Sequence, residues 1–334
     1  MSRTSTVLAG MGGLALGTGI LTVLTGRSRP SLESLKTLDP PAGLPPAHIV
    51  ALPGRGEIFY RDQPAPSPDA PTVVLLHGWM ATADLNWFTV YRPLGSFARI
   101  IAPDHRGHGR AVRHSQPFRL SDVADDVAEL LHHLDTGPVI IVGFSMGGPV
   151  AQLLWQRHPD LVAGVVMCST AAHFAFGPLL GAHWRLMSLY QLGSRLLPRL
   201  WLERALLAQM TGVLPVRLVQ SVGPDVAHME PLLPWIVGEI ARGDVEDVSE
   251  AGRELGRFDS RGWVGGMDRP AAVLVTTHDR LIPPSSQLEL AGLLPDALVL
   301  EVQADHDAAA AVPDEFAAAL VAAVRFVWDR CADV

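Results

Sequence analysis

A serine flanked by glycines stands at the end of an apolar stretch in the segment VIIVGFSMGGPVAQ, residues 139–152. The Gly-x-Ser-x-Gly sequence is weak evidence by itself, because 31 of the 334 residues are glycine and chance matches occur. Its context strengthens it, since a strand pattern precedes Ser145 and a helix pattern follows, as in a strained turn that exposes a serine hydroxyl. An ordinary tight turn is the alternative, and we predict that Ser145 is a nucleophile.

A serine nucleophile needs a base, and the base needs an acid that orients it. The sequence has 13 histidines, so their positions must select among them. Open α/β sheets build their sites at the carboxyl ends of strands. His306 follows the apolar stretch 297–303, and Asp279 ends the stretch 271–279. We therefore predict His306 as the base and Asp279 as the acid, in the chain order expected for this serine turn. Three neighbouring titratable residues are less favoured for these roles: His278, Asp305 and Asp307.

A serine nucleophile also needs two backbone N–H groups that bind the oxyanion formed on attack. One is expected from Met146, directly after the serine, where a helix N-terminus favours negative charge. The other is expected from Trp79, in the loop after the apolar stretch TVVLLHG, residues 72–78. His77 is expected to form a local hydrogen bond rather than to transfer a proton.

The elements that must position these residues are apolar strands that alternate with helices. Continuous apolar runs without a polar face are typical of strands buried on both sides. Alternating strands and helices predict an α/β protein with a mostly parallel central sheet and helices on both faces. An opening hairpin is expected over residues 48–62. Buried strands are expected at 72–78, 98–104, 138–144, 162–170, 271–279 and 297–303, and helices at 120–135, 148–160 and 314–330.

Residues 173–265 interrupt this alternation, because they contain helix patterns separated by proline and glycine and no clear buried strand. We interpret them as a helical cap inserted over one end of the sheet. Their methionines and aromatic residues are consistent with ordinary helix packing, and some are expected to line a cavity. The candidate substrate-binding residues are Trp184, Met187 and Tyr190.

The first 29 residues form an N-terminal apolar segment, and residues 4–26 carry no charge. As a helix, 23 such residues would rise roughly 34 Å, enough to cross a hydrocarbon core of about 30 Å. We expect a single membrane anchor, with an exported signal segment or a helix packed on the domain as alternatives. The protein is then membrane-associated or exported, on a side that the flanking charges do not decide. A proline-rich linker is expected at 30–47 and the folded domain at 48–330.

The composition narrows the class of partner. The hydrophobic content of 48% and charged content of 18% predict a folded chain rather than a disordered one. The net charge of -8 argues against nucleic acid as a partner. Cys168 and Cys331 form no disulfide framework and lack the spacing of a zinc site. The predicted chemistry requires no metal and no organic cofactor.

These motifs together resemble the α/β-hydrolase superfamily, in its serine esterase and lipase branch. The resemblance covers about residues 48–330 and implies that the insertion is the family's cap or lid. It also implies that Asp104 and Arg106 brace a turn and are not catalytic. The matching stretches, in family order and spacing, are HGW (77–79), DHRGHGR (104–110), GFSMGG (143–148), HDRLIPP (278–284) and ADHD (304–307).

Two positions matter for what the resemblance implies. Many relatives have glycine directly before the catalytic histidine, where this chain has Asp305. Relatives that open epoxides or cleave carbon–halogen bonds use an aspartate nucleophile, so Ser145 disfavours those reactions.

The expected function is hydrolysis of carboxylic esters, with lipophilic acyl or lipid esters as small-molecule substrates, through an acyl-enzyme on a Ser-His-Asp triad. A cofactor-free perhydrolase, also called a non-haem haloperoxidase, is the first alternative because it resembles this chain at HGW and GFSMGG. A thioesterase or a carbon–carbon hydrolase would use the same triad with a different pocket. A ligand-binding protein without catalysis is a further alternative, which an intact apparent triad disfavours.

Overall fold

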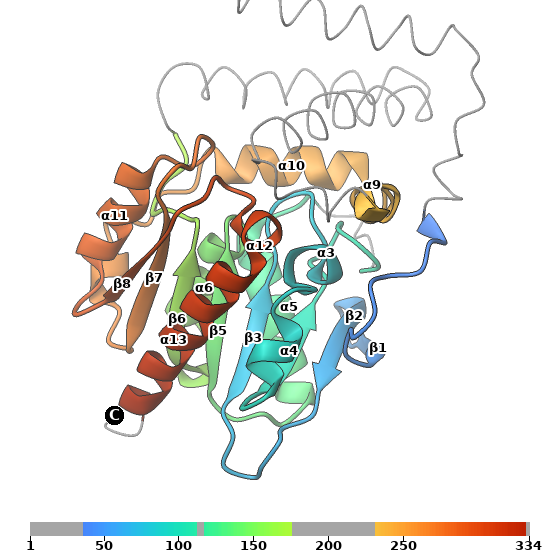
Figure 1. The fold of residues 1–334 in the computed structure, drawn as a ribbon, viewed down its shortest axis with the longest axis horizontal. Helices are drawn as coiled ribbons and strands as arrows, with labels where there is room; N and C mark the ends of the chain where they lie inside the picture. The colour runs from blue at the N-terminus through green and yellow to red at the C-terminus, as the bar shows by residue number, and fades with distance from the viewer. Residues whose placement is uncertain (1–35, 112–116, 176–230, 332–334) are drawn as a thin grey trace, which may run out of the picture.

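The computed structural model describes residues 36–111, 117–175 and 231–331. Within these ranges eight strands form one sheet in the order β1-β2-β4-β3-β5-β6-β7-β8 (Figure 1). Strand β2 pairs antiparallel with both of its neighbours, β1 and β4. The other strands, β4, β3, β5, β6, β7 and β8 in sheet order, run parallel to one another. The expected mostly parallel sheet is confirmed. The strands are β1 Ala47–Leu52, β2 Gly56–Gln63, β3 Thr72–Leu76, β4 Arg99–Pro103, β5 Val139–Phe144, β6 Val162–Cys168, β7 Ala271–Thr276 and β8 Leu298–Val302.

Helices cover both faces of the sheet, as the alternating pattern predicts. One face carries α5, α6 and α11, and the other carries α3, α4, α12 and α13 (Figure 1). Two further helices, α9 and α10, lie over the carboxyl ends of the strands. The helices are α3 Ala83–Trp87, α4 Tyr91–Gly95, α5 Leu120–His133, α6 Gly147–Arg157, α9 Leu233–Ile240, α10 Val245–Leu255, α11 Pro284–Leu293, α12 Ala308–Ala311 and α13 Pro313–Cys331, with short 3-10 turns η1 Pro159–Leu161 and η3 Val264–Gly266.

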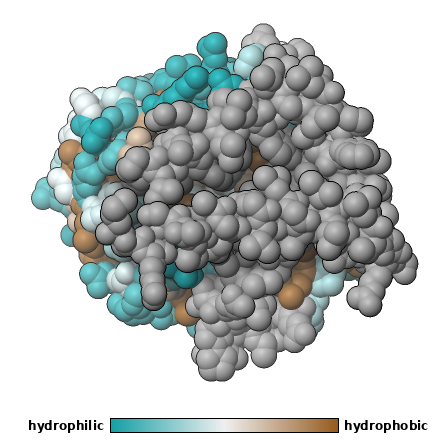
Figure 2. Space-filling view, turned by 90° about the horizontal axis from the view of Figure 1, so that it is seen from above, coloured by the Kyte–Doolittle hydropathy of each residue, from teal (hydrophilic) through white to brown (hydrophobic). Residues whose placement is uncertain are grey.

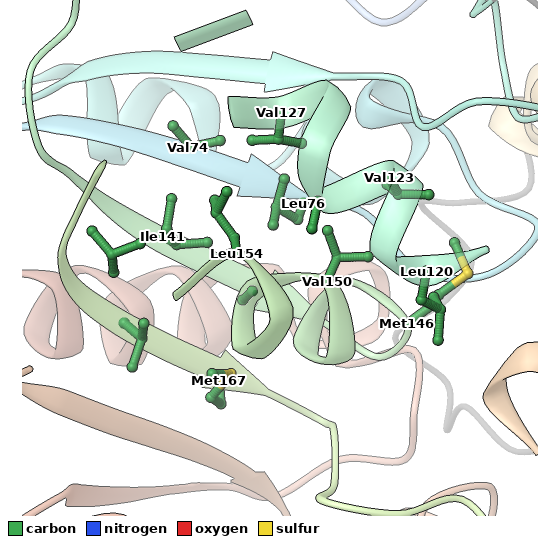
Figure 3. Packing of buried hydrophobic residues seen from close by; sticks show 14 of the residues in the cluster. Val74, Leu76, Leu120, Val123, Val127, Ile141, Met146, Val150, Leu154 and Met167 are labelled. Carbon is green, nitrogen blue, oxygen red and sulfur yellow. The ribbon is translucent and has the colours of Figure 1, made fainter. Parts of the chain in front are cut away.

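Each central strand buries side chains on both faces of the sheet. In β3, Val74 and Leu76 pack toward α5 and α6, whereas Val73 and Leu75 pack toward α4 and α13. Figure 3 shows the first of these layers, where Val74 and Leu76 meet side chains of α5 and α6. The strand ends are therefore held by packing on two sides. This fixes the loops that follow the strands in space.

The segment predicted to be a cap begins and ends at neighbouring points. His173 and Asp259 form an isolated antiparallel bridge, and the Ser260 N–H donates to the Ala172 carbonyl at 2.7 Å. Between these points the structure describes α9 and α10, and residues 176–230 lie outside the described residues. The proposed cap boundaries of 173–265 stay a prediction.

Buried polar contacts attach α9 to the loop after β3. The Glu239 side chain is 1% exposed, and its carboxylate accepts from the Thr82 hydroxyl at 2.8 Å. Arg110 and Arg242 donate to the same carboxylate at 2.8 and 2.7 Å. Because a buried carboxylate is costly without such partners, these contacts fix where α9 sits on the domain.

The end of the predicted linker lies against the domain. The Pro45 carbonyl accepts from the Arg61 guanidinium at 2.9 Å, and Leu44 packs on the core at the α4 and α13 face. Strand β1 begins at Ala47, one residue before the predicted start of the domain. The apolar segment 4–26 lies outside the described residues. Within the described ranges, no helix has both the length and the apolar character needed to span a membrane.

Three histidines are buried side by side beneath the loops after β3 and β4. The His77 and His105 rings lie 4.0 Å apart between centroids, and His108 lies 5.6 Å from His77. The His77 Nδ1–H donates to the Gly78 carbonyl at 2.8 Å, and its Nε2 accepts from the His105 N–H. His77 therefore forms a local hydrogen bond, as expected from the sequence.

Burial keeps these imidazoles neutral, because a charged ring would lose its water without gaining a counter-ion. It lowers the pKa of His105 to about 3 and that of His108 to about 4, and it lowers the pKa of His77 well below 6.5. Burial has the opposite effect on the adjacent Asp104 carboxyl and raises its pKa to about 6.

We expect the free energy of unfolding to fall as pH drops from about 6.5 toward 4. In that range the unfolded chain would bind protons on all three histidines, while the folded state would not. The folded state would bind one proton on Asp104 that the unfolded chain does not, which offsets one histidine. A net two protons corresponds to about 2.7 kcal/mol per pH unit. Urea denaturation at several pH values measures this slope. His108→Asn keeps a donor for the Arg106 carbonyl and should reduce the slope by about one proton; an unchanged slope contradicts the assignment.

Candidate active site

Ser145 occupies the turn between β5 and α6, and its backbone adopts a left-handed conformation with φ +52°. This conformation costs a non-glycine residue of order 1–3 kcal/mol, so its surroundings must hold it. The Ser145 N–H donates to the Cys168 carbonyl at 3.0 Å, and the Ser145 carbonyl accepts from Thr170 Oγ1 at 2.8 Å. The end of β6 therefore stabilises the strained turn that lifts the serine side chain.

The glycines around Ser145 are required by close backbone approach. A Cβ on Gly147 would lie 2.1 Å from the Leu76 carbonyl oxygen at the end of β3. A Cβ on Gly143 would lie 2.4 Å from the Gly147 carbonyl oxygen. No side chain fits at either position, so the turn can form only with glycine there. This explains physically why the serine segment contains the glycines on which its prediction relied.

The three predicted triad residues form one continuous chain of hydrogen bonds. His306 Nε2 lies 3.0 Å from Ser145 Oγ, and His306 Nδ1 lies 2.8 Å from Asp279 Oδ2. Both contacts have hydrogen-bond length, and a hydroxyl and a carboxylate face opposite nitrogens of the same ring. With Nδ1–H donating to Asp279, Nε2 is the acceptor that faces the serine hydroxyl. The structure thus brings together Ser145 (6% exposed), His306 and the buried Asp279.

Residues that sequence reasoning did not single out hold Asp279 in place. Its Oδ1 accepts from the Leu281 and Ile282 N–H groups at 2.9 and 2.8 Å. Its Oδ2 accepts from Thr276 Oγ1 at 2.9 Å and from Gln287 Nε2 at 3.2 Å. These donors leave the carboxylate one orientation, with Oδ2 toward His306. The spacing of Thr276 and Asp279 at a strand end is visible in the sequence, but Gln287 comes from α11 and has no such signal.

The two predicted oxyanion donors belong to loops beside Ser145. Met146 is buried at the N-cap of α6, and no backbone hydrogen bond between described residues uses its N–H. A Cβ built on Gly78, next to Trp79, would lie 3.3 Å from the Ser145 Cβ, so the loop after β3 adjoins the serine. The Gly78 N–H donates to Asn86 Oδ1 at 2.8 Å, a residue not predicted from the sequence. The role of the Met146 and Trp79 N–H groups as oxyanion donors stays a prediction.

The Trp79 side chain joins this loop to the cap. Its Nε1–H donates to the Val248 carbonyl of α10 at 2.7 Å. In Figure 2, which views the molecule from above, the described surface that is visible is largely hydrophilic with scattered apolar residues. The loop after β3 is thus fixed both from below, by the sheet, and from above, by α10.

The three less favoured titratable residues are His278, Asp305 and Asp307, and the structure gives them other contacts. The His278 side chain is exposed, and it is His306 that contacts Ser145. Asp305 accepts from backbone N–H groups and from Arg280 and does not contact the His306 ring. Burial raises the pKa of Asp307, and the negative charge of Asp305 adds to this effect.

The remaining predictions concern the cap, the motif DHRGHGR and metals. Trp184, Met187 and Tyr190 lie outside the described residues.

Asp104 accepts from the Ala83 and Arg110 N–H groups at 2.7 and 2.8 Å, and Arg106 forms a two-point hydrogen bond with Asp126. Both side chains therefore brace the loops after β3 and β4. The described part of the chain holds no cluster of three or more histidine, cysteine or acidic residues that could bind a metal ion.

A family model described as "alpha/beta hydrolase fold" matches residues 71–196, a range that contains Ser145 and the loop after β3. The architecture and the match agree with the motifs found in the sequence. This chain has the α/β-hydrolase fold.

Solved α/β hydrolases share its fold. An enol-lactonase from Burkholderia xenovorans superposes with a TM-score of 0.69 at 23% identity, covering 83% of this chain and all of that one. At this identity the likeness shows the fold alone.

Curated relatives differ in how much of their length matches this chain. Epoxide hydrolase B of Mycobacterium tuberculosis is 32% identical over 107 residues, which is 30% of this chain and 29% of the relative. The bifunctional esterase/perhydrolase DCH of Acinetobacter calcoaceticus is 35% identical over 115 residues, 34% of this chain and 41% of the relative. The chain thus matches less than half the length of these two relatives. A pimeloyl-[acyl-carrier protein] methyl ester esterase of Chromobacterium violaceum is 29% identical over 241 residues, 71% of this chain and 87% of the relative.

We expect Gly147→Ala to destabilise the protein by about 3 kcal/mol or more, because its Cβ would collide with backbone rather than with a movable side chain. Gly292→Ala is the matched control, since a Cβ at that exposed position of α11 meets nothing within 4 Å. That variant should gain about 0.5–1 kcal/mol from helix propensity. Denaturant titration of both variants measures the difference, and equal stabilities would contradict the proposed contact.

Proposed function

We propose that this α/β hydrolase cleaves carboxylic esters through an acyl-enzyme on Ser145. The observation that carries the proposal is the hydrogen-bonded chain from Ser145 through His306 to Asp279. A serine hydroxyl is a weak nucleophile at neutral pH, and this arrangement is one that activates it. The esterase names of two curated relatives support the same reaction class.

In the acylation step, Ser145 Oγ attacks the ester carbonyl carbon while His306 Nε2 takes the hydroxyl proton. Asp279 stabilises the imidazolium through the bond at Nδ1. The carbonyl oxygen becomes an oxyanion, which the N–H groups of Met146 and Trp79 would bind. When the tetrahedral intermediate collapses, the carbon–oxygen bond breaks and His306 returns the proton to the leaving alcohol.

In the deacylation step, water replaces the alcohol. His306 Nε2 takes a proton from the water as its oxygen attacks the acyl carbon. The second tetrahedral intermediate collapses, the carboxylic acid leaves, and the proton returns to Ser145 Oγ. Both steps use the contact between Ser145 and His306, which the fold already holds at hydrogen-bond distance.

The serine disfavours epoxide opening, although one relative is named an epoxide hydrolase. Attack of a serine oxygen on an epoxide carbon would give an alkyl ether, which water and His306 could not cleave. Attack on an ester carbonyl gives an acyl ester, which the same residues can hydrolyse. Ser145 therefore supports acyl transfer.

A lipophilic acyl or lipid ester is the proposed substrate class. Apolar side chains gather where α9 meets α3 and α12, next to the His306 loop, and Phe88 packs edge-on against Trp235 at 5.5 Å between ring centroids. The Phe144 ring lies 5.3 Å from the His306 ring, so the base itself borders an apolar wall. Such surroundings favour an apolar acyl chain.

Ser145→Ala should reduce ester hydrolysis by about a thousandfold or more, because it removes the nucleophile. Nitrophenyl esters from acetate to long-chain acids, assayed with the full-length protein, measure this loss. Ser285→Ala, at an exposed position of α11, is the control and should keep wild-type rates. A Ser145→Ala protein as active as wild type would contradict the mechanism.

The chain-length profile of the same assay tests the substrate class. Each buried methylene contributes about 0.8 kcal/mol, or about fourfold in kcat/KM. We expect octanoate to exceed butyrate by roughly tenfold or more after incomplete burial is allowed for. Preference for acetate over every longer ester would contradict a lipophilic substrate while leaving the serine mechanism intact.

Peracid formation is the second candidate function. It is favoured by the match to a bifunctional esterase/perhydrolase, which is 35% identical to this chain over 115 residues. The same acyl-enzyme would be attacked by hydrogen peroxide in place of water. With acetate and peroxide as substrates, peracetic acid is measured beside ester hydrolysis. We expect hydrolysis to dominate, and peracid formation that exceeds it would reverse the order of the two candidates. An acyl thioester in the same series tests the thioesterase alternative.

A further inference from the structure

The loops that carry Asp279 and His306 pair beyond the ends of their strands. The Thr277 N–H donates to the Val302 carbonyl at 3.0 Å, and the His278 N–H donates to the Ala304 carbonyl at 3.0 Å. These backbone bonds continue the pairing of β7 with β8 toward the site. They stop just before the two residues that must meet.

The Asp305 side chain continues this pairing where the backbone stops. Its Oδ1 accepts from the Arg280 N–H at 2.9 Å, one residue after Asp279. The same oxygen accepts from the His306 N–H at 2.8 Å. Asp305 thus ties the residue after the acid to the backbone of the base, in parallel with the Asp279–His306 bond itself.

We propose that Asp305 is a positioning residue for the triad, which holds the Asp279 and His306 loops at the separation their hydrogen bond requires. This inference rests on the proposed esterase function. Without the Asp305 carboxylate, the Arg280 and His306 N–H groups would lose their shared acceptor. The His306 ring could then shift relative to both Asp279 and Ser145, and a shift of about 1 Å can cost about a hundredfold in rate.

The backbone bonds, rather than the ion pair with Arg280, carry this role. The Arg280 side chain is 65% exposed, and exposed ion pairs contribute little because water and salt screen them. The Asp305 side chain is 19% exposed. Burial opposes its ionisation, but the N–H groups of Arg280 and His306, together with the Arg280 guanidinium, outweigh burial and lower its pKa. The carboxylate is therefore matched to these two donors.

Three variants separate the contacts. Asp305→Ala removes both acceptor bonds, and we expect kcat to fall about tenfold or more while KM stays within about twofold. Asp305→Asn keeps an oxygen that can accept from both N–H groups, and it should restore kcat to within about threefold of wild type. Arg280→Ala removes the ion pair and keeps both backbone bonds, so it should also stay within about threefold. Should Asp305→Ala fail to fold, Asp305→Leu replaces it, because its side chain is close to asparagine in size and has no acceptor for the two N–H groups.

A proton NMR measurement tests the geometry without any substrate. The Nδ1–H of His306, bonded to Asp279, should give a downfield resonance that His306→Gln removes. We expect Asp305→Ala to broaden or shift this resonance and Asp305→Asn to preserve it.

The outcomes distinguish the two proposals. Wild-type kcat and an unchanged resonance in Asp305→Ala would overturn the positioning role. Loss of kcat in Asp305→Asn equal to that in Asp305→Ala would assign the effect to charge and would also overturn it. A wild-type protein that hydrolyses no ester and takes up no fluorophosphonate on Ser145 would overturn the esterase function. The resonance would then still show whether Asp305 holds the pair together.

Discussion

The start of α6 lies so close to the end of β3 that no side chain fits at Gly147, and the rest of the site depends on that contact. It forces the chain to turn sharply out of β5, and the turn places Ser145 in a left-handed conformation. The strain is held by bonds from the end of β6, so three adjacent parts of the sheet contribute to one residue. The hydroxyl then projects above the sheet edge, where the loops after β7 and β8 can reach it.

The three residues proposed as a triad were predictable because they are polar residues at the ends of apolar strands, and parallel strands end at a common edge. Ser145, Asp279 and His306 could be chosen on that basis, and the structure brings all three together. Gln287 and Asn86 could not, because they come from helices whose contact with the site depends on packing across the domain. Asp305 stands beside the base in sequence. Its bond to Arg280 forms only because β7 and β8, which are separated in sequence, pair in the sheet. The candidate cap residues lie outside the described residues and stay predictions.

The site is held from two directions by different physics. Below it, apolar side chains on both faces of the sheet fix the strand ends by packing. Above it, buried polar contacts attach the cap, through Glu239 on α9 and through Trp79, whose indole bonds to α10. Buried carboxylates and indoles must find particular partners, so they fix orientation more strictly than apolar contacts do. The loop after β3 carries both polar links, and the predicted oxyanion donor Trp79 lies within it.

The bridge between His173 and Asp259 brings together the two ends of the segment predicted to be a cap, since the chain returns to the point from which it departed. An insertion whose ends already lie together can change in length or sequence without moving the strands on either side, because the closure entropy grows only slowly with length. The residues proposed to attack the ester and those proposed to select it would therefore be separable in evolution. A new specificity could arise by replacing one contiguous stretch of the gene, while the serine, the base and the acid keep their places.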